Sequence, residues 1–171
     1  EFDEMLEGSM VAETEVFFTE LLTKNLSVAN FIHSSFLMLN RPMAKHYGIK
    51  GVSGELFQHV DLPVGNPRGG LLTHASILKV SANGTSTSPV IRGVWVLERI
   101  LGITPQPPPP GVPGVEPDIR GAKTVREVLA KHRSLETCNG CHRVIDPPGF
   151  ALESYDVIGG WRDRFRSMGE G

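Results

Sequence analysis

The chain has 171 residues and a formal net charge of -2, and 40% of its residues are hydrophobic and 21% charged. This length allows one domain with a buried core, or two small modules that share an interface. The small net charge gives no reason to expect nucleic acid or a membrane surface as a partner. No apolar stretch approaches the roughly 20 residues that a membrane-spanning helix needs, so we expect no membrane insertion.

The first fifty residues carry helical signals. Apolar residues at helical spacing predict an amphipathic helix over residues 3–24. Ser27 is expected to cap a short helix over residues 28–32, and Asn40 to cap a third, which tolerates a proline in its first turn and ends at Gly48. The acidic start of the chain shows no secretory signal, and we interpret the chain as a piece of a longer polypeptide.

The middle of the chain mixes one strand signal with two helix signals. Residues 55–62 alternate apolar and polar side chains and are the best strand candidate, although no partner strand is obvious. A helix is expected over residues 71–81. Thr87-Ser88-Pro89 is a strong helix start. That helix is expected to run to residue 101 and to bury four apolar side chains, Val90, Val94, Leu97 and Leu101.

A proline-rich segment over residues 105–117 has no helix or strand signal and is expected to be extended. After it, the capping box at Thr124 predicts a helix over residues 125–134. Residues 146–149 read as a turn and residues 150–155 as one more short helix. The predicted fold is therefore mainly α, with few strands.

The most informative segment is Cys138-Asn139-Gly140-Cys141-His142, which contains the only two cysteines of the chain. Two thiols separated by two residues and followed by histidine are the pattern for covalent attachment of a c-type haem. Each thiol adds to one vinyl group of the porphyrin, and the imidazole of His142 becomes the proximal iron ligand. We therefore predict one covalent haem c. Because this attachment normally takes place outside the cytoplasm, the parent protein is expected to be exported, to the periplasm or the cell surface.

Three other interpretations of the two cysteines are weaker. A structural zinc site needs four ligands, usually in two pairs, and this chain has one pair of cysteines. A thioredoxin-like redox pair is expected at a helix N-terminus after a strand of an α/β sheet, whereas the surroundings here are helical. A disulfide across two residues closes so small a loop that it stabilises little.

Residues after the motif are candidates to surround the haem. Four of them could form an apolar wall: Phe150, Leu152, Tyr155 and Trp161. Arg162, Arg164 and the indole N–H of Trp161 are candidate partners for the propionates. These aromatic residues could equally fill a small core. The backbone carbonyl of Asp146 or Pro147 could accept a hydrogen bond from the second ring nitrogen of His142.

The ligand on the other side of the iron is left open by the sequence. Methionine there raises the reduction potential and a second histidine lowers it. The metal-ligand candidates are His74 and Met168, with His46 beside Tyr47 as a further candidate and less support for His59, His132, Met38 and Met43. For each of these an ordinary structural role is the stronger expectation, and an open sixth site is a further alternative.

The order of motifs resembles the C-terminal modules of the large planctomycete-type cytochrome c proteins. The resemblance covers most of the chain and rests on Leu39-Asn40, His46-Tyr47-Gly48-Ile49, Arg68 to Thr73, Thr87 to Gly93, the proline run, His132-Arg133, Cys138 to His142, Asp146 to Glu153 and Gly160-Trp161-Arg162. It implies an exported multi-domain protein in which Cys138, Cys141 and His142 hold the haem.

These observations divide the chain into a helical module over residues 1–104, a proline-rich linker over 105–120 and a haem-binding module over 121–171. The first functional hypothesis is electron transfer to a redox partner protein or to another domain of the parent chain. The second is a haem enzyme, or a sensor of gas or peroxide, with an open sixth site. The third is a binding module with a structural haem, for which a polysaccharide partner has no support in the sequence.

Overall fold

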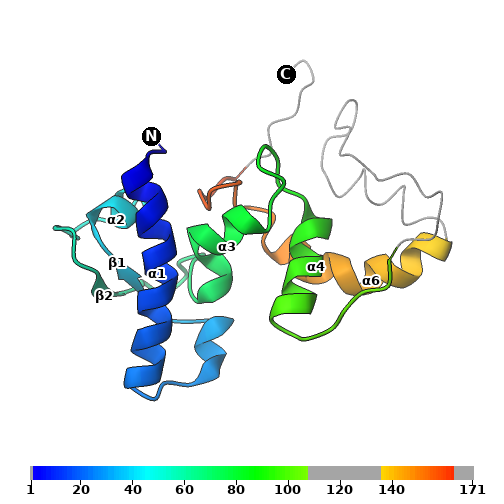
Figure 1. The fold of residues 1–171 in the computed structure, drawn as a ribbon, viewed down its shortest axis with the longest axis horizontal. Coiled ribbons are helices and arrows are strands. Elements are labelled where there is room, and N and C mark those ends of the chain that lie inside the picture. The colour runs from blue at the N-terminus through cyan, green and yellow to red at the C-terminus, as the bar shows by residue number, and fades with distance from the viewer. Residues whose placement is uncertain (1, 108–135, 164–171) are drawn as a thin grey trace. The chain divides into compact units, whose positions relative to one another are not determined.

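The computed structural model describes residues 2–107 and 136–163, and its fold is mainly helical, as predicted (Figure 1). Its elements are α1 (Glu4–Thr23), the 3-10 helix η1 (Val28–Phe31), β1 (Phe36–Leu39), α2 (Arg41–Tyr47), β2 (Gln58–Asp61), the 3-10 helix η2 (Leu71–Thr73), α3 (Ala75–Val80), α4 (Pro89–Arg99) and α6 (Glu136–Ala151). The helix predicted over residues 125–134 lies outside the described residues, as does most of the proline-rich segment.

The chain forms two compact units. The first unit comprises residues 1–80 together with 155–161, and the second comprises residues 81–154 together with 162–171. This division differs from the three modules predicted from the sequence, since it groups α4 with the helix that carries the two cysteines. The module boundaries themselves stay a prediction.

Capping explains where the helices of the first unit begin and end. The carboxylate of Asp3 accepts a hydrogen bond from the backbone N–H of Leu6 and starts α1. Asn40 caps α2 in the same way, and Gly48 ends that helix in the left-handed conformation, at φ 71°. The helices predicted over residues 3–24 and from Asn40 to Gly48 are thus confirmed, while the segment after Ser27 is a short 3-10 helix.

A small antiparallel two-stranded sheet packs against α1. Strand β2 lies within the segment predicted as a strand, and it pairs with β1 from Phe36 opposite Asp61 to Leu39 opposite Gln58. All four residues of β1 are buried. Because a strand buried throughout shows no polar alternation, periodicity gave no sign of this partner. Apolar side chains of α1, β1 and α2 form the main core around Met10, Leu37 and Met43.

The helix predicted over residues 71–81 is interrupted. The 3-10 helix η2 ends before His74, whose backbone is extended at φ -68° and ψ 139°, and α3 begins at the next residue. The interruption places the side chain of His74 in the interior, where its exposed fraction is 0%.

In the second unit, α4 and α6 approach each other so closely that their backbones touch (Figure 1). A Cβ atom on Gly93 would lie 1.9 Å from the carbonyl oxygen of Ile145, and one on Gly149 would lie 1.8 Å from the carbonyl oxygen of Pro89. Both contacts are far shorter than a van der Waals contact, so only glycine fits at either position.

This close approach corrects the predicted buried face of α4. The helix begins after the Ser88 cap as expected, but its buried residues are Pro89, Arg92, Gly93, Val96 and Leu97. Leu101 lies beyond its end and is 55% exposed. Leu97 is buried as predicted, but the backbone contact at Gly93 turns the helix so that Val90 and Val94 are only half-buried.

The turn predicted over residues 146–149 and the separate helix over 150–155 are wrong. Helix α6 runs without interruption from Glu136 to Ala151 and contains Pro147 and Pro148. Proline removes a hydrogen bond from a helix interior and usually breaks it. Here the packing of Ile145 and Gly149 against α4 favours a continuous helix at this point.

The crossing of α4 and α6 can be tested by replacing two helical glycines with alanine. One glycine lies in the contact between the two helices and the other lies outside it. Gly93→Ala should lower the free energy of unfolding by about 1–3 kcal/mol, because its methyl group overlaps the Ile145 carbonyl. Gly140→Ala, on α6 with nothing within 4 Å of the added Cβ, should instead raise it by about 0.5–1 kcal/mol. Urea unfolding of both variants provides the measurement. Equal effects of the two substitutions would contradict the crossing.

Candidate functional site

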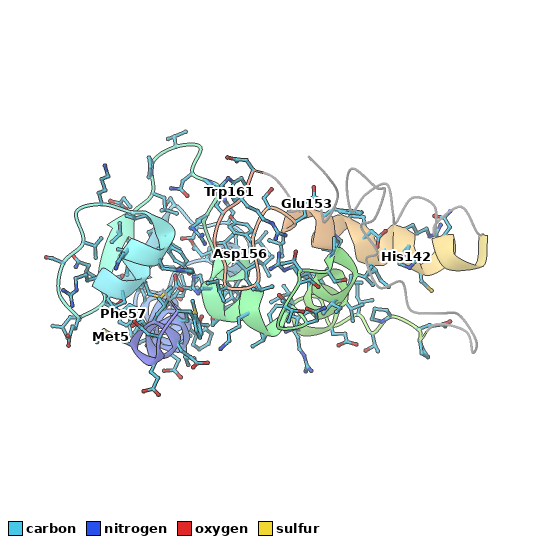
Figure 2. All side chains as sticks on the ribbon, turned by 90° about the horizontal axis from the view of Figure 1, so that it is seen from above. Met5, Phe57, His142, Glu153, Asp156 and Trp161 are labelled. Carbon is cyan, nitrogen blue, oxygen red and sulfur yellow. The ribbon has the colours of Figure 1, made fainter. Side chains whose placement is uncertain are left out.

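The cysteine motif lies on α6. In a helix, residues three and four positions apart share one face, so residues 138, 141 and 142 lie on the same side of α6. Figure 2 labels His142 on this helix. Cys141 is half-buried, and the side chain of His142 is 14% exposed. The side chain of Cys138 lies outside the described residues.

The ring of His142 is held by a carboxylate. Its Nδ1 atom lies 2.9 Å from Oδ1 of Asp146, one helical turn further along α6. The expected backbone carbonyl acceptor is therefore wrong: in a continuous helix the carbonyl of Asp146 points along the axis, whereas its side chain reaches back to the preceding turn. Asp146 is 1% exposed, so the pair lies at the boundary between core and solvent.

The four predicted wall residues are divided between the two units. Phe150 is half-buried and Leu152 is 7% exposed, and both belong to the second unit with His142. Tyr155 and Trp161 belong to the first unit, where their rings meet edge to face at 5.1 Å. The hydroxyl of Tyr155 donates to the carbonyl of Pro67, and burial raises the pKa of this phenol to about 12.

The arginine predicted to bind a propionate has partners within its own unit. Nη2 of Arg162 donates to the hydroxyl of Thr87 and, over 3.0 Å, to the carbonyl of Glu153. These bonds tie the end of the described chain to the segment before α4 and to the segment after α6. Arg164 and Met168 lie outside the described residues.

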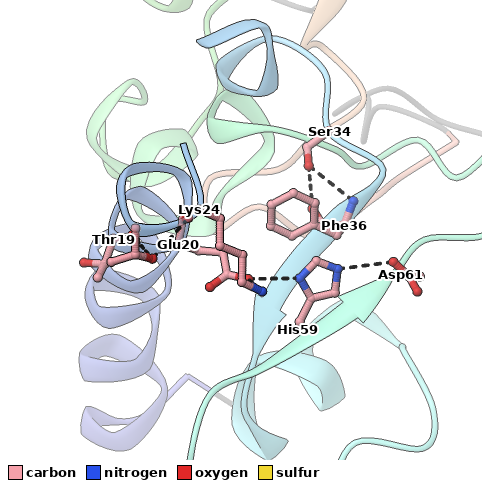
Figure 3. Close-up of polar contacts among 8 residues, drawn as sticks. Thr19, Glu20, Lys24, Ser34, Phe36, His59 and Asp61 are labelled. Atoms are coloured by element: carbon pink, nitrogen blue, oxygen red, sulfur yellow. Dashed lines mark hydrogen bonds and ion pairs between the residues drawn. The ribbon is translucent and has the colours of Figure 1, made fainter. Parts of the chain in front are cut away.

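Several sixth-ligand candidates take part in other contacts in the first unit. Nε2 of His46 lies 2.7 Å from the carbonyl of Ile158, and both ring nitrogens of His59 face carboxylates, of Glu20 at 3.3 Å and Asp61 at 3.2 Å (Figure 3). Met38 and Met43 are buried in apolar clusters, and His132 lies outside the described residues. The sixth ligand stays a prediction.

His74, the other candidate, is part of a buried polar cluster that the sequence analysis missed. Its Nδ1 atom lies 3.1 Å from the hydroxyl of Thr14, and its ring meets Phe17 edge to face. In the same unit Glu13 is 0% exposed and accepts a hydrogen bond from the Tyr47 hydroxyl at 2.7 Å. One polar atom of each residue, Oε1 of Glu13 and Nε2 of His74, has no hydrogen-bond partner.

The signal for Glu13 was present in the sequence. It occupies the helical stripe that also carries Leu6, Met10, Phe17 and Leu21, all of which are buried. A carboxyl group within an apolar stripe is a candidate buried acid, because burial of a charge without a partner is unfavourable.

Arg68 contacts the same buried cluster, which consists of Glu13, Thr14, Tyr47 and His74. Its guanidinium carbon is 3.8 Å from the centre of the Tyr47 ring, and its Nη atoms donate to the carbonyls of Thr73 and Gly159. Burial raises the pKa of Glu13 to about 8, although the Tyr47 hydrogen bond and the Arg68 charge oppose this change. Burial, helped by the charge of Arg68, lowers the pKa of His74 to about 3. At neutral pH both groups are therefore mostly uncharged.

The donor set on α6 consists of the residue types that covalent attachment of a haem requires. Cys141 and His142 lie on one face of α6 with the backbone of Cys138, and the carboxylate of Asp146 orients the imidazole, so these residues fit the group. Within residues 2–107 and 136–163, no cluster of three or more His, Cys, Asp or Glu residues is arranged to bind a bare metal ion. None of the helices in this part of the chain is long and apolar enough to cross a membrane.

Comparison with known families gives two matches. A family model described as PSCyt3, a protein of unknown function (DUF1588), matches residues 68–165, more than half of the 171 residues. The chain belongs to this family. A second model, described as PSD4, a protein of unknown function (DUF1592), matches residues 1–49. The two family names suggest planctomycete cytochrome-like domains, in agreement with the resemblance. Searches among curated proteins and among solved structures found no match.

The PSCyt3 match begins at Arg68 and includes the cysteine motif. Part of the buried cluster therefore belongs to the PSCyt3 region, and part, with Glu13 and Tyr47, to the PSD4 region.

The two opposite pKa changes predict a stability maximum at mildly acidic pH. The raised pKa of Glu13 makes stability fall as pH rises from about 4.5 to 8, and the lowered pKa of His74 makes it fall as pH drops from about 6.5 to 3. Glu13→Gln should remove the decline between pH 6.5 and 8, as measured by urea unfolding at a series of pH values.

Glu15→Gln is the matched control for this prediction, since Glu15 lies on the exposed face of the same helix. It should leave the decline above pH 6.5 unchanged. A decline that persists in Glu13→Gln would show that another group causes it.

Proposed function

We propose that the chain is a c-type cytochrome domain that carries one covalent haem and transfers electrons within a larger exported protein. The observation that supports it best is the arrangement on α6, where two cysteines and a histidine share one helical face and the histidine ring is held by Asp146. The membership in the PSCyt3 family agrees with this proposal.

Each residue of the motif has a distinct task. Cys138 and Cys141 would form the two thioether bonds, and His142 would supply the proximal ligand through Nε2, because Nδ1 faces the carboxylate. Phe150, half-buried in the same unit, would offer apolar contact. When bound, the haem iron supplies one-electron redox chemistry that no side chain here provides.

The position of the motif supports electron transfer. Cys141 and His142 are partly exposed, so a group attached to them lies near the surface of its unit, where another domain or a partner protein can approach it. We propose a redox partner protein, or another domain of the parent chain, as the electron donor or acceptor. Export of the parent follows from the covalent attachment, which normally takes place outside the cytoplasm.

The coordination of the iron distinguishes electron transfer from the enzymatic and sensory alternatives. The chain, exported together with a haem-attachment system, should give spectra of low-spin, six-coordinate iron in both oxidation states, because simple electron transfer needs no open ligand position. The measurement is a pair of visible spectra of oxidised and reduced protein, with and without carbon monoxide.

A high-spin ferrous iron that binds carbon monoxide, together with turnover of peroxide, would contradict electron transfer and favour an open-site enzyme or sensor. A control with His142→Ala should lose the proximal ligand and change both spectra.

A further inference from the structure

Asp146 combines three properties that a solvent-exposed helix residue would not have. Its side chain is 1% exposed, it contacts the histidine of the cysteine motif, and it lies beside the residue at which α6 meets α4. We propose that Asp146 is a positioning residue for His142, which fixes the tautomer and orientation of the ring and lowers the reduction potential of the attached haem. This inference rests on the proposed function.

The contact with Asp146 selects one tautomer of His142. In the proposed arrangement Oδ1 of Asp146 accepts and Nδ1 of His142 carries the hydrogen across the 2.9 Å between them. The lone pair of the neutral imidazole is then on Nε2, the atom that an iron ligand uses. Without this acceptor, both tautomers would be accessible.

The backbone holds the carboxylate in place. Asp146 is four residues after His142, a spacing at which two helical side chains face each other. The neighbouring Ile145 carbonyl lies against Gly93, with no room for a Cβ atom between the helices. The backbone of α6 is therefore fixed against α4 beside Asp146, whose buried side chain faces His142.

The charge of the acceptor has an electronic consequence. A carboxylate draws the Nδ1 hydrogen more strongly than a neutral carbonyl does, so the imidazole becomes a stronger donor at Nε2. Burial of the pair increases this interaction, because the surrounding dielectric constant is low. Stronger donation stabilises the ferric state over the ferrous state, which lowers the reduction potential.

The test replaces the carboxylate of Asp146 with a neutral amide of nearly the same shape. Asp146→Asn should raise the reduction potential, increasing the ferrous-to-ferric ratio at a fixed potential by roughly tenfold, equal to about 59 mV for a one-electron couple. Asp163→Asn, which removes the same charge from an exposed position of the same unit, should leave the potential unchanged. A pyridine haemochrome spectrum of each protein establishes that the haem is attached.

Each result has a defined meaning. An attached haem with the same potential in wild type and Asp146→Asn overturns the role of Asp146 and leaves the proposed function standing. A wild type without any thioether-linked haem overturns the proposed function itself.

If Asp146→Asn does not fold, ¹⁵N shifts of labelled His142 in the wild-type chain before haem attachment decide the question, because both ring nitrogens are then free to carry the hydrogen. A hydrogen on Nδ1 supports the inference, and a hydrogen on Nε2 overturns it.

Discussion

The contact between the backbones of α4 and α6 is the constraint on which the second unit depends. Glycine at positions 93 and 149 allows carbonyl oxygens to occupy the space of a side chain, which brings the two helices together. This contact accounts for the buried face of α4 and for the continuity of α6 through two prolines. It also keeps Asp146 in the interior, one turn from His142. The geometry of the candidate site therefore follows from two residues that have no side chains.

The first unit is organised around a different kind of interaction. A carboxyl group, an imidazole and a phenol lie in its core with a guanidinium stacked on the phenol ring, and one polar atom of the carboxyl group and one of the imidazole have no hydrogen-bond partner. Burial makes Glu13 and His74 neutral, which removes the larger cost of burying their charges. The guanidinium of Arg68 instead donates to the carbonyls of Thr73 and Gly159. The segment from Tyr155 to Trp161 is held in this unit by Arg68, by His46 and by the Pro67 carbonyl.

The sequence predicted best the features that depend on a few neighbouring residues. The caps at Asn40 and Ser88 are local hydrogen bonds, and the helices that they begin are present. The sequence could not reveal β1, because its burial on both faces removes the alternation that marks a strand. It also predicted a turn at Asp146, since the effect of two prolines is local, whereas the packing that favours a helix there comes from α4.

In the candidate site too, the features that depend on tertiary contacts could not be predicted from neighbouring residues. The spacing of Cys138, Cys141 and His142 needed no tertiary information. The acceptor for the His142 ring depended on whether the chain turned or stayed helical after Ile145, and so the carbonyl prediction was wrong. The wall residues were chosen by proximity in sequence, but Tyr155 and Trp161 belong to the first unit. The unit to which an apolar side chain belongs is decided by tertiary contacts, and the hydrophobicity of the sequence does not reveal these contacts.

Covalent binding of haem to this chain is tested most directly by the mass of the intact protein and of its peptides after export. We expect one haem per chain, carried by the peptide that contains Cys138 and Cys141, and a loss of one attachment point in Cys138→Ala. A chain exported beside a working haem-attachment system with both thiols unmodified, and with no haem mass on any peptide, would contradict it.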